Sequence, residues 1–447
     1  MLMENMGLCL DDRPEEGVFR VHRRVFTDPD LFELEQKFIF ERTWIFLTIE
    51  SQLPKPGDFI TTWIGRTPVL VTRDAKGRLN AFSNVCRHKG AVVQRADKGN
   101  TKYHVCAYHG WAYDPTGCIV DVKEHDAGKY SPAFDAAEHN LQPIAALASY
   151  NGIVFGSLSP NVPPLDEYLG DIRFFLDLVM DQGPQGMEFL PGRAAYTFRA
   201  NWKMQMDNGL DSYHLSSTHA SFADVIQRRK KGEGHQEARQ YDWSQRFKGS
   251  GGSFSFKHGH SAIWSRPNEP HKRPIYPSID EVKKRVGEVK AEWMLGGRNT
   301  IIFPNFQTAD SSALLMRQFR PLGVGLTEMR VWCLAPIGES REQRSWRLRQ
   351  FEDFFNPSGF ATPDDSMVYE DCHTGSAGTG FDYLDGYARG LTVQERGAND
   401  VARSIGINPV SSIQGPFELS AETWHHPPHR EWRRLMEAGL AGKEAYR

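Results

Sequence analysis

The chain has 447 residues, 40% of them hydrophobic and 24% charged, which is typical of a globular protein large enough for more than one domain. Its 53 Lys and Arg against 56 Asp and Glu give a net charge of −3, which argues against a nucleic-acid-binding protein. No apolar run is long enough for a membrane span, and the acidic start lacks the pattern of a secretory signal. Six cysteines in so long a chain do not indicate a disulfide scaffold, so we expect a cytoplasmic protein.

The first third of the chain changes from helical to strand-like patterning. Asp28-Pro29 predicts the start of a helix, with proline at its first position, and apolar residues follow at helical spacing. Short apolar runs then predict strands at residues 59–64, 69–72, 79–82 and 152–158, with hairpin turns at 74–77 and 114–117. Residues 45–160 are therefore predicted to form a small all-β domain, which ends before the proline-rich segment 160–164.

The remainder mixes strands and helices. Runs at residues 300–303, 313–319 and 328–335 predict antiparallel strands. Ser278 with Glu281, and Ser340 with Gln343, have the capping-box spacing, and Val282, Val286, Val289 and Trp293 follow the first pair on one helical face. Because strands and helices do not alternate regularly, the sequence favours an α+β fold.

Four potential metal ligands stand in two short segments of the predicted all-β domain. Cys86-Arg87-His88 and Cys106-Ala107-Tyr108-His109 give the pattern C-x-H-x17-C-x2-H. A Rieske [2Fe–2S] cluster needs two Cys on one iron and two His on the other. A structural Cys2His2 zinc site uses the same ligand types and is the alternative, although zinc sites favour other spacings. The remaining thiols, Cys9, Cys118, Cys333 and Cys372, have no such partners and are interpreted as ordinary core or surface cysteines.

A second ligand pattern, D-x2-H-x4-H, runs from Asp211 through His214 to His219. On a helix Asp211 would lie near the face of His214 and could accept a hydrogen bond from its ring. The two histidines would lie about 140° apart around a straight helix, so their convergence requires a π-bulge or a helix end between them. Two histidines with one carboxylate form the facial triad of non-haem Fe(II) oxygenases, whereas a pair of buried structural histidines is the alternative.

The carboxylate of such a triad should come from a distant segment. Thr362-Pro363-Asp364-Asp365 opens a predicted helix after a glycine-containing loop. An N-cap role for these residues is the alternative on sequence grounds alone. The histidine-rich segment 424–429 could suggest another metal site, but its prolines favour a packed or exposed terminal segment.

These motifs, together with Asn201-Trp202-Lys203 and Glu292-Trp293-Met294, resemble the large (α) subunits of Rieske non-haem iron ring-hydroxylating dioxygenases, and in particular the benzoate, toluate and anthranilate 1,2-dioxygenase group. The resemblance implies a helix-grip catalytic domain with a large antiparallel sheet, made of residues 161–447 with an N-terminal segment, 1–44, around the Rieske domain, 45–160. It implies that Cys86, His88, Cys106 and His109 hold the [2Fe–2S] cluster, and that His214, His219 and Asp365 bind a mononuclear Fe(II). It also implies that Asp211 links an iron ligand to a cluster histidine of a neighbouring subunit in a ring-shaped trimer.

The resemblance further implies a terminal oxygenase that uses O2 and NADH electrons to convert the ring of a benzoate-like aromatic carboxylate to a cis-diol. The electrons would come through a separate flavin/[2Fe–2S] reductase, because no G-x-G-x-x-G motif opens a βαβ unit here. A small β subunit would complete an α3β3 assembly, with α3 as the other possibility, and neither nucleic acid nor membrane is an expected partner. The alternatives are a Rieske monooxygenase, such as a salicylate-type hydroxylase or a demethylase, and a pure electron-transfer protein.

The sequence departs from that group in places that bear on the substrate. Asp207 stands where relatives of the benzoate type usually carry Glu before Asn208. Residues 215–223, 225–265 and 366–400 also diverge. The metal chemistry is unaffected by these differences, but the aromatic substrate is left open.

Overall fold

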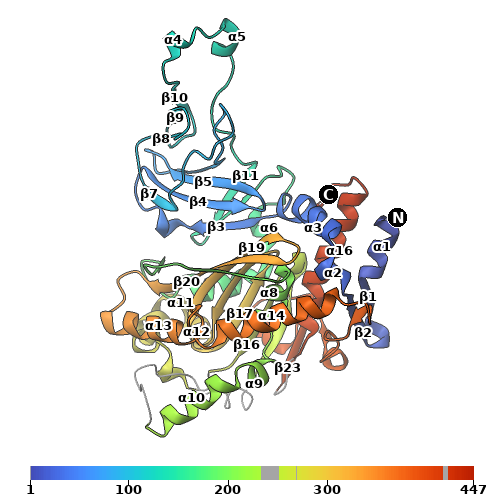
Figure 1. The fold of residues 1–447 in the computed structure, drawn as a ribbon. Coiled ribbons are helices and arrows are strands. Elements are labelled where there is room, and N and C mark those ends of the chain that lie inside the picture. Colours follow the sequence, from blue (N-terminus) through green and yellow to red (C-terminus); the bar gives the residue numbers. More distant parts are fainter. Residues whose placement is uncertain (1, 233–250, 268, 416–420, 447) are drawn as a thin grey trace. The chain divides into compact units, whose positions relative to one another are not determined.

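The computed structural model describes residues 2–232, 251–267, 269–415 and 421–446 (Figure 1). They form two compact units: residues 40–165, and residues up to 39 together with those from 166 onward. Part of the diverging stretch 225–265 lies outside the described residues. No helix among the described residues combines the length and the apolar character that crossing a bilayer requires.

The unit of residues 40–165 is built mainly from short antiparallel strands. They form three sheets in the orders β6-β5-β4-β7, β10-β9-β8 and β11-β12-β3. The strands are β3 (Ile45–Ile49), β4 (Asp58–Ile64), β5 (Thr67–Arg73), β6 (Leu79–Ser83), β7 (Lys98–Asn100), β8 (His104–Val105), β9 (Ala112–Tyr113), β10 (Ile119–Asp121), β11 (Ala146–Tyr150) and β12 (Ile153–Ser157). Two single-turn helices, α4 (His125–Gly128) and α5 (Pro132–Asp135), interrupt them. The strands predicted from the apolar runs are therefore confirmed.

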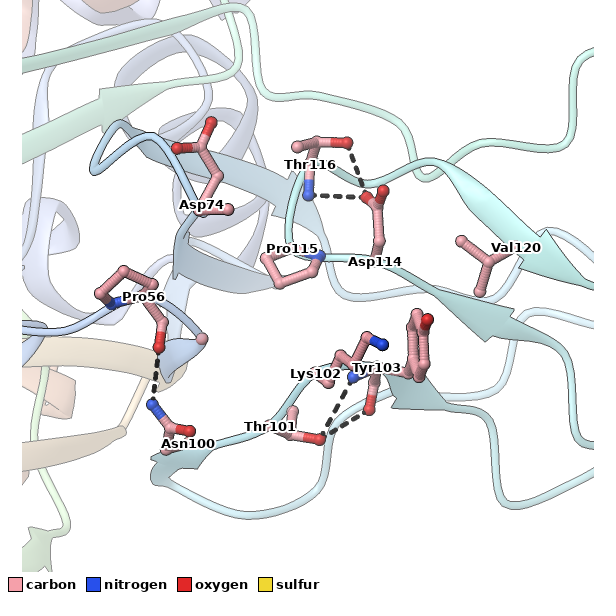
Figure 2. A pocket seen from close by; sticks show the side chains of 12 residues that line it. Pro56, Asp74, Asn100, Thr101, Lys102, Tyr103, Asp114, Pro115, Thr116 and Val120 are labelled. Carbon is pink, nitrogen blue, oxygen red and sulfur yellow. Dashed lines mark hydrogen bonds between the residues drawn. The ribbon is translucent and has the colours of Figure 1, made fainter.

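Both hairpin turns predicted in this unit border one surface hollow of about 460 Å³. Figure 2 shows Asp74 on one side of it and Pro115 and Thr116 on another, with Tyr103 on a third segment. Asp114 fixes its turn by accepting hydrogen bonds from the backbone N–H groups of Thr116 (2.8 Å) and Cys118 (3.1 Å). No Cys or His lines this hollow, so it has the character of a turn-lined depression and offers no metal ligands.

The larger unit is organised around one ten-stranded antiparallel sheet. Its strand order is β13-β20-β19-β18-β17-β16-β15-β23-β22, and β14 also pairs with β20. The strands are β13 (Met187–Phe189), β14 (Ala194–Phe198), β15 (Gly251–Ser255), β16 (Ser261–Ser265), β17 (Gly297–Ile302), β18 (Phe306–Asp310), β19 (Leu314–Gly323), β20 (Leu326–Pro336), β22 (Glu395–Arg396) and β23 (Ser411–Gly415). A separate small sheet joins β1 (Leu10–Arg13), β2 (Val18–His22) and β21 (Tyr383–Leu384). The prediction of an α+β fold with a large antiparallel sheet is confirmed.

The helices of this unit lie between and around those strands. They are α1 (Leu2–Cys9), α2 (Arg24–Thr27), α3 (Pro29–Glu35), α6 (Leu165–Leu169), α7 (Arg173–Met180), α8 (Trp202–Asn208), α9 (Leu215–Thr218), α10 (Ala220–Lys230), α11 (Ile279–Val286), α12 (Glu288–Leu295), α13 (Arg341–Phe354), α14 (Ala361–Ala377), α15 (Asp400–Ser404) and α16 (His426–Leu440). Helix α14 packs against α8, α9 and β14 (Figure 1), and α8 in turn contacts β19. These contacts bring segments around residues 208, 214 and 365 together.

The three helix starts predicted from capping residues are confirmed, but the capping hydrogen bond expected from Ser278, which directly precedes α11, is absent. Asp28 accepts hydrogen bonds from the N–H groups of Asp30 and Leu31 and begins α3, and Ser340 accepts one from Gln343 N–H and begins α13. Ser278 makes no cap hydrogen bond, because its hydroxyl instead accepts from Gln343 Nε2 at 2.9 Å. The helix expected after it also breaks at Gly287, whose φ of 87° is left-handed, so that Val289 in α12 is exposed.

Candidate metal centres

The four residues of the C-x-H-x17-C-x2-H pattern lie on two loops that are built alike. In the first loop Gly90 N–H donates to Cys86 C=O and Cys86 N–H to Ala91 C=O, at 3.0 and 2.8 Å. In the second, Gly110 N–H donates to Cys106 C=O and Cys106 N–H to Trp111 C=O, at 2.9 and 2.8 Å. Gly90 and Gly110 both turn with left-handed φ, 74° and 76°, which an L side chain rarely adopts. Each loop therefore presents one thiol and one imidazole from a matching turn.

The two loops bring their histidines together and bury their cysteines. The rings of His88 and His109 have centroids 4.4 Å apart, and His88 stacks on Trp111 at 4.9 Å. Cys86 and Cys106 are buried in an apolar core that includes Phe59, Leu70 and Phe82. His88 Nδ1 is buried and, among the described residues, has no hydrogen-bond partner, as a nitrogen free to bind a metal should be.

This arrangement fits two irons better than one zinc. The ligand atoms of a tetrahedral zinc site converge on one ion, about 2.0–2.3 Å from each. Among the described residues, one group of His, Cys, Asp or Glu side chains converges in that way, and it consists of His214, His219 and Asp365. No three of the four residues on these two loops do so. A [2Fe–2S] cluster instead places two cysteines on one iron and two histidines on the other.

Tyr113 is a neighbour of the candidate cluster ligands that sequence reasoning missed. Its ring is fully buried, and its hydroxyl lies 3.4 Å from Cys86 Sγ and accepts a hydrogen bond from Arg87 N–H at 3.2 Å. Burial and the adjacent Cys86 raise the pKa of this phenol well above its usual range, so the hydroxyl keeps its proton. It can therefore donate to the sulfur, and hydrogen bonds to sulfur tune the potential of an iron–sulfur cluster.

A second cluster of ligands lies in the larger unit. His214, His219 and Asp365 place one ligand atom each within 4.8 Å of one another. Asp365 Oδ1 is 3.2 Å from His219 Nε2 and 3.5 Å from His214 Nε2. Asp365 is the fifth residue of α14 and is not its N-cap, since Phe360 occupies that position without a side-chain hydrogen bond. Two imidazoles and one carboxylate converging on one point match the facial triad.

The two histidines converge because the helix is interrupted between them. His214 immediately precedes the single-turn α9, and His219 separates α9 from α10 with φ −106° and ψ 32°. The helix end predicted from their spacing is therefore confirmed. Asp211 lies in the turn before α9 and not on a helix, yet it accepts the predicted hydrogen bond from His214 Nδ1, at 2.9 Å.

Each histidine has its own orienting carboxylate. Asp211 accepts from His214 Nδ1, and Asp364 accepts from His219 Nδ1 at 3.3 Å. With Nδ1 so engaged, both rings turn Nε2 toward Asp365, which is how outer-shell carboxylates prepare imidazoles for a metal. The sequence pointed to Asp211 but not to Asp364. The sequence signal that could have identified Asp364 was its position next to Asp365 on the predicted helix. Consecutive helical residues face different directions, so the two acids contact different atoms.

The charge at this centre suits a divalent cation. Burial would raise the pKa of Asp365, but the hydrogen bonds from His214 and His219 outweigh burial and hold that pKa well below its usual range. For Asp211 too, the His214 hydrogen bond outweighs burial and lowers the pKa. Several carboxylates around two imidazoles leave an excess of negative charge in a partly buried place, and bound metal is the usual compensation.

Asn208, another residue that the sequence did not single out for a role, lies beside the triad. Its Nδ2 is 3.4 Å from both His214 Nε2 and Asp365 Oδ1. The buried Tyr369 on α14 donates to Asn208 Oδ1 at 2.7 Å and fixes the amide's orientation. The amide nitrogen therefore borders the space in front of the three ligand atoms.

The histidine-rich C-terminal segment has a structural role around Asp207. His425 Nδ1 and His429 Nε2 donate to Asp207 Oδ1 at 3.2 and 3.0 Å, and the Tyr387 hydroxyl donates to Oδ2 at 2.9 Å. Burial is outweighed by these histidines, so the pKa of Asp207 lies well below its usual range. His425, His426 and His429 are all buried, which agrees with the packed-segment interpretation. Asp207 thereby fastens α16 to the end of α8.

Comparison with known proteins finds a matching family for each of the two units. Residues 43–146 match the Rieske [2Fe-2S] domain family, and residues 189–432 match the family described as ring hydroxylating alpha subunit (catalytic domain). The chain is 39% identical to toluate 1,2-dioxygenase subunit alpha of Pseudomonas putida, covering 98% of each chain. It is also 39% identical to the anthranilate 1,2-dioxygenase large subunit of Acinetobacter baylyi, covering 97% of this chain and 93% of the relative. The naphthalene 1,2-dioxygenase structure from Rhodococcus sp. superposes with a TM-score of 0.81 at 26% identity, covering 98% of each chain.

We expect Tyr113→Phe to lower the reduction potential of the iron–sulfur cluster by about 40 mV. A hydrogen bond to sulfur stabilises the more electron-rich reduced state, a typical hydrogen bond contributes about 1 kcal/mol, and about 59 mV corresponds to a tenfold change for one electron. Redox titration of the visible spectrum measures the shift. Tyr103→Phe, at an exposed tyrosine of the same unit, is the matched control. An unchanged potential in Tyr113→Phe would contradict the hydrogen bond to Cys86.

We expect Asp365→Ala to reduce the iron content from three to two per chain while the visible spectrum of the cluster stays unchanged. The substitution removes the one carboxylate that faces both Nε2 atoms, and a triad without its carboxylate holds iron weakly. Metal analysis and absorbance are the measurements, with thermal unfolding as a check on the fold. Asp371→Ala, at an exposed position of the same helix, should keep three irons. Full iron content in Asp365→Ala would exclude this residue as a ligand.

Proposed function

Because the chain belongs to the family of ring-hydroxylating oxygenase α subunits, we propose that it dihydroxylates the ring of an aromatic carboxylate. It is an oxidoreductase that incorporates O2, with a Rieske [2Fe–2S] domain and a catalytic domain that binds mononuclear iron. The proposal of a cis-diol product, with the chain acting as the terminal oxygenase, rests chiefly on one observation: relatives named for toluate, 2-halobenzoate and anthranilate each share 39% identity over at least 97% of this chain.

We assign the cofactors to the two ligand sets described above. A [2Fe–2S] cluster held by Cys86, His88, Cys106 and His109 would supply electrons singly, and an Fe(II) held by His214, His219 and Asp365 would activate O2. The matching loops and the buried, unpartnered His88 Nδ1 support the first assignment. The converging Nε2 atoms support the second. The domain division, with the cluster in residues 45–160 and the iron in 161–447, follows from these assignments.

The protein's own side chains would prepare the iron centre before any substrate arrives. Asp211 and Asp364 accept hydrogen bonds from the Nδ1 atoms, so both imidazoles turn Nε2 toward the point where a metal ion would replace the Nε2 protons. Tyr369 holds the Asn208 amide at the edge of the open side. Phe354 and Phe355 line the same space and give it an apolar side, which an aromatic ring could contact.

We also propose the assembly that this chemistry requires. Asp211 is 22% exposed, and Tyr213, two residues further on, is more exposed still, so a neighbouring subunit could reach His214 through Asp211. An α3 ring, with or without a small β subunit, would place a cluster histidine there. Electrons from NADH would arrive through a separate reductase. None of the six cysteines, all of which lie in the described residues, forms a disulfide, which supports a reducing compartment such as the cytoplasm.

The alternative of a pure electron carrier is wrong, since residues 189–432 match a catalytic domain and three metal-ligand side chains converge within it. The monooxygenase alternative differs from our proposal in the number of oxygen atoms transferred. An experiment with labelled oxygen separates the two.

We expect turnover of an aromatic carboxylate under 18O2, with NADH and a reductase, to give a cis-diol that contains two labelled oxygen atoms. Mass spectrometry of the product counts them. Benzoate, 3-methylbenzoate, 2-chlorobenzoate and 2-aminobenzoate form the test panel. A product with one labelled atom would assign the chain to monooxygenation, and no product from any acid of the panel would contradict the proposed substrate class.

We expect Asp211→Ala to keep both metals yet lose at least about 100-fold in turnover, because His214 loses the group that orients it and the link toward the neighbouring cluster. Product formation and iron content are measured together. Rapid reduction of the cluster with slowed reoxidation in the presence of substrate and O2 is the specific signature. Asp224→Ala on α10, an exposed aspartate, should behave as the unmodified enzyme. Normal turnover in Asp211→Ala would refute the assigned role.

A further inference from the structure

Arg317 is a buried cation at the iron centre. It lies on β19, opposite Val331 of β20 and Gln307 of β18, and only 7% of it is exposed. It lines the same cavity as His214, His219 and Asp365. A guanidinium in such a place normally requires an anionic partner, because an uncompensated buried charge is costly.

The other buried arginines of the described chain all have such partners. Arg273 and Arg298 share Asp310, Arg347 binds Glu339 at 2.5 Å, and Arg330 binds Glu328 at 3.1 Å. Within the described residues Arg317 makes no ion pair and donates no hydrogen bond, and its Nε is buried without a partner. Its one interaction of note is with the ring of Phe355, whose centroid lies 4.8 Å from Cζ. That contact holds the guanidinium plane but leaves its N–H donors unused.

Two further polar atoms of the same cavity are also unsatisfied. Ser212 Oγ and Asn299 Oδ1 are buried and have no partner among the described residues. Asn299 is held in place by its other amide atom, since Nδ2 donates to Gly209 C=O at 3.2 Å. One cation, one hydroxyl and one amide oxygen, all buried and all without partners, therefore border the space next to the iron ligands. Buried polar groups rarely remain unsatisfied unless a ligand or water completes them.

We propose that Arg317 binds the carboxylate of the aromatic substrate and so selects acids over neutral rings. This inference rests on the proposed function, because it presupposes an aromatic acid at this iron. A planar guanidinium can bind a carboxylate through two parallel N–H···O hydrogen bonds, which fixes direction as well as charge. In 1,2-dioxygenation of a benzoate one attacked carbon carries the carboxylate, so the recognising cation must border the iron itself. Arg317 meets that requirement.

The cavity is narrow between the described side chains, with about 30 Å³ of free space. This volume suits about one water molecule and not a benzene ring, so the lining side chains must move when substrate binds. The apolar lining residues Leu215, Phe354 and Phe355 would then contact the ring. Because Phe355 also stacks on Arg317, its movement would expose the guanidinium to the incoming carboxylate.

The test compares an acid with its amide in the assembled oxygenase. The acid is the best substrate of the panel above, and the amide replaces its carboxylate with a neutral group of the same shape. For Arg317→Gln we expect kcat/KM for the acid to fall by about 100-fold or more, as happens when one partner of a buried charge pair is lost, and kcat/KM for the amide to change by less than about threefold. Arg317→Lys keeps the charge without the planar fork, and an approximately tenfold loss for the acid is expected.

Equilibrium binding gives a readout that does not depend on turnover. Calorimetric titration with the acid should show the same loss of affinity in Arg317→Gln, with the cluster spectrum and three irons per chain retained. Arg330→Gln, at a buried arginine of the neighbouring strand β20, is the matched control and should leave the acid-to-amide ratio unchanged. If Arg317→Gln fails to fold, the tenfold effect in Arg317→Lys decides the question.

The outcomes separate the two proposals. If the unmodified enzyme prefers the amide or accepts no acid, the proposed substrate class fails. If the unmodified enzyme prefers the acid and the Arg317 variants keep that preference, the assignment of Arg317 fails while the proposed function stands. An equal loss for acid and amide would likewise overturn the assignment, since a role in packing alone would affect both.

Discussion

The catalytic unit depends on one carboxylate that faces two imidazoles. Asp365 Oδ1 lies within 3.5 Å of both Nε2 atoms, in a place where few water molecules can share the charge. Two further carboxylates, those of Asp211 and Asp364, accept hydrogen bonds from the Nδ1 atoms of the two rings and so orient them. Helix α14 contributes two of these three acids at adjacent positions, and the interrupted helix α9–α10 contributes both rings. The packing of α14 against α8 and α9 therefore brings together the side chains that could hold a cation.

The smaller unit places its cysteines and its histidines in different environments. Its two cysteines are buried among aromatic and aliphatic side chains, whereas His109 is exposed at the other end of its loop. A cluster held in this way would have a shielded sulfur-bound iron and a histidine-bound iron near the surface. Electrons would then leave through the imidazole edge, which is the shortest path to a partner outside the unit.

Much of this could be predicted from local spacing, and the remainder could not. The separation of His214 and His219 required a broken helix, and the two Cys–His pairs required two matching loops, because both constraints act within a few residues. The failure at Ser278 has a different origin: Gln343, 65 residues away, takes the hydroxyl that would have capped the helix. Asp364, Tyr113 and Arg317 likewise acquire their significance only from neighbours that the fold brings close. A lone arginine in a strand carries no sign that it lacks an acid.

Asp207 couples two distant segments of the chain in a way that constrains their evolution. Its two oxygens accept hydrogen bonds from His425, His429 and Tyr387, while the next residue, Asn208, lies beside His214 of the candidate metal centre. A neutral side chain at 207 would leave the donors His425, His429 and Tyr387 without their charged acceptor. We therefore expect a substitution at position 207 to be accompanied by substitutions at 387, 425 and 429 in orthologues. The C-terminal segment would then co-vary with helix α8.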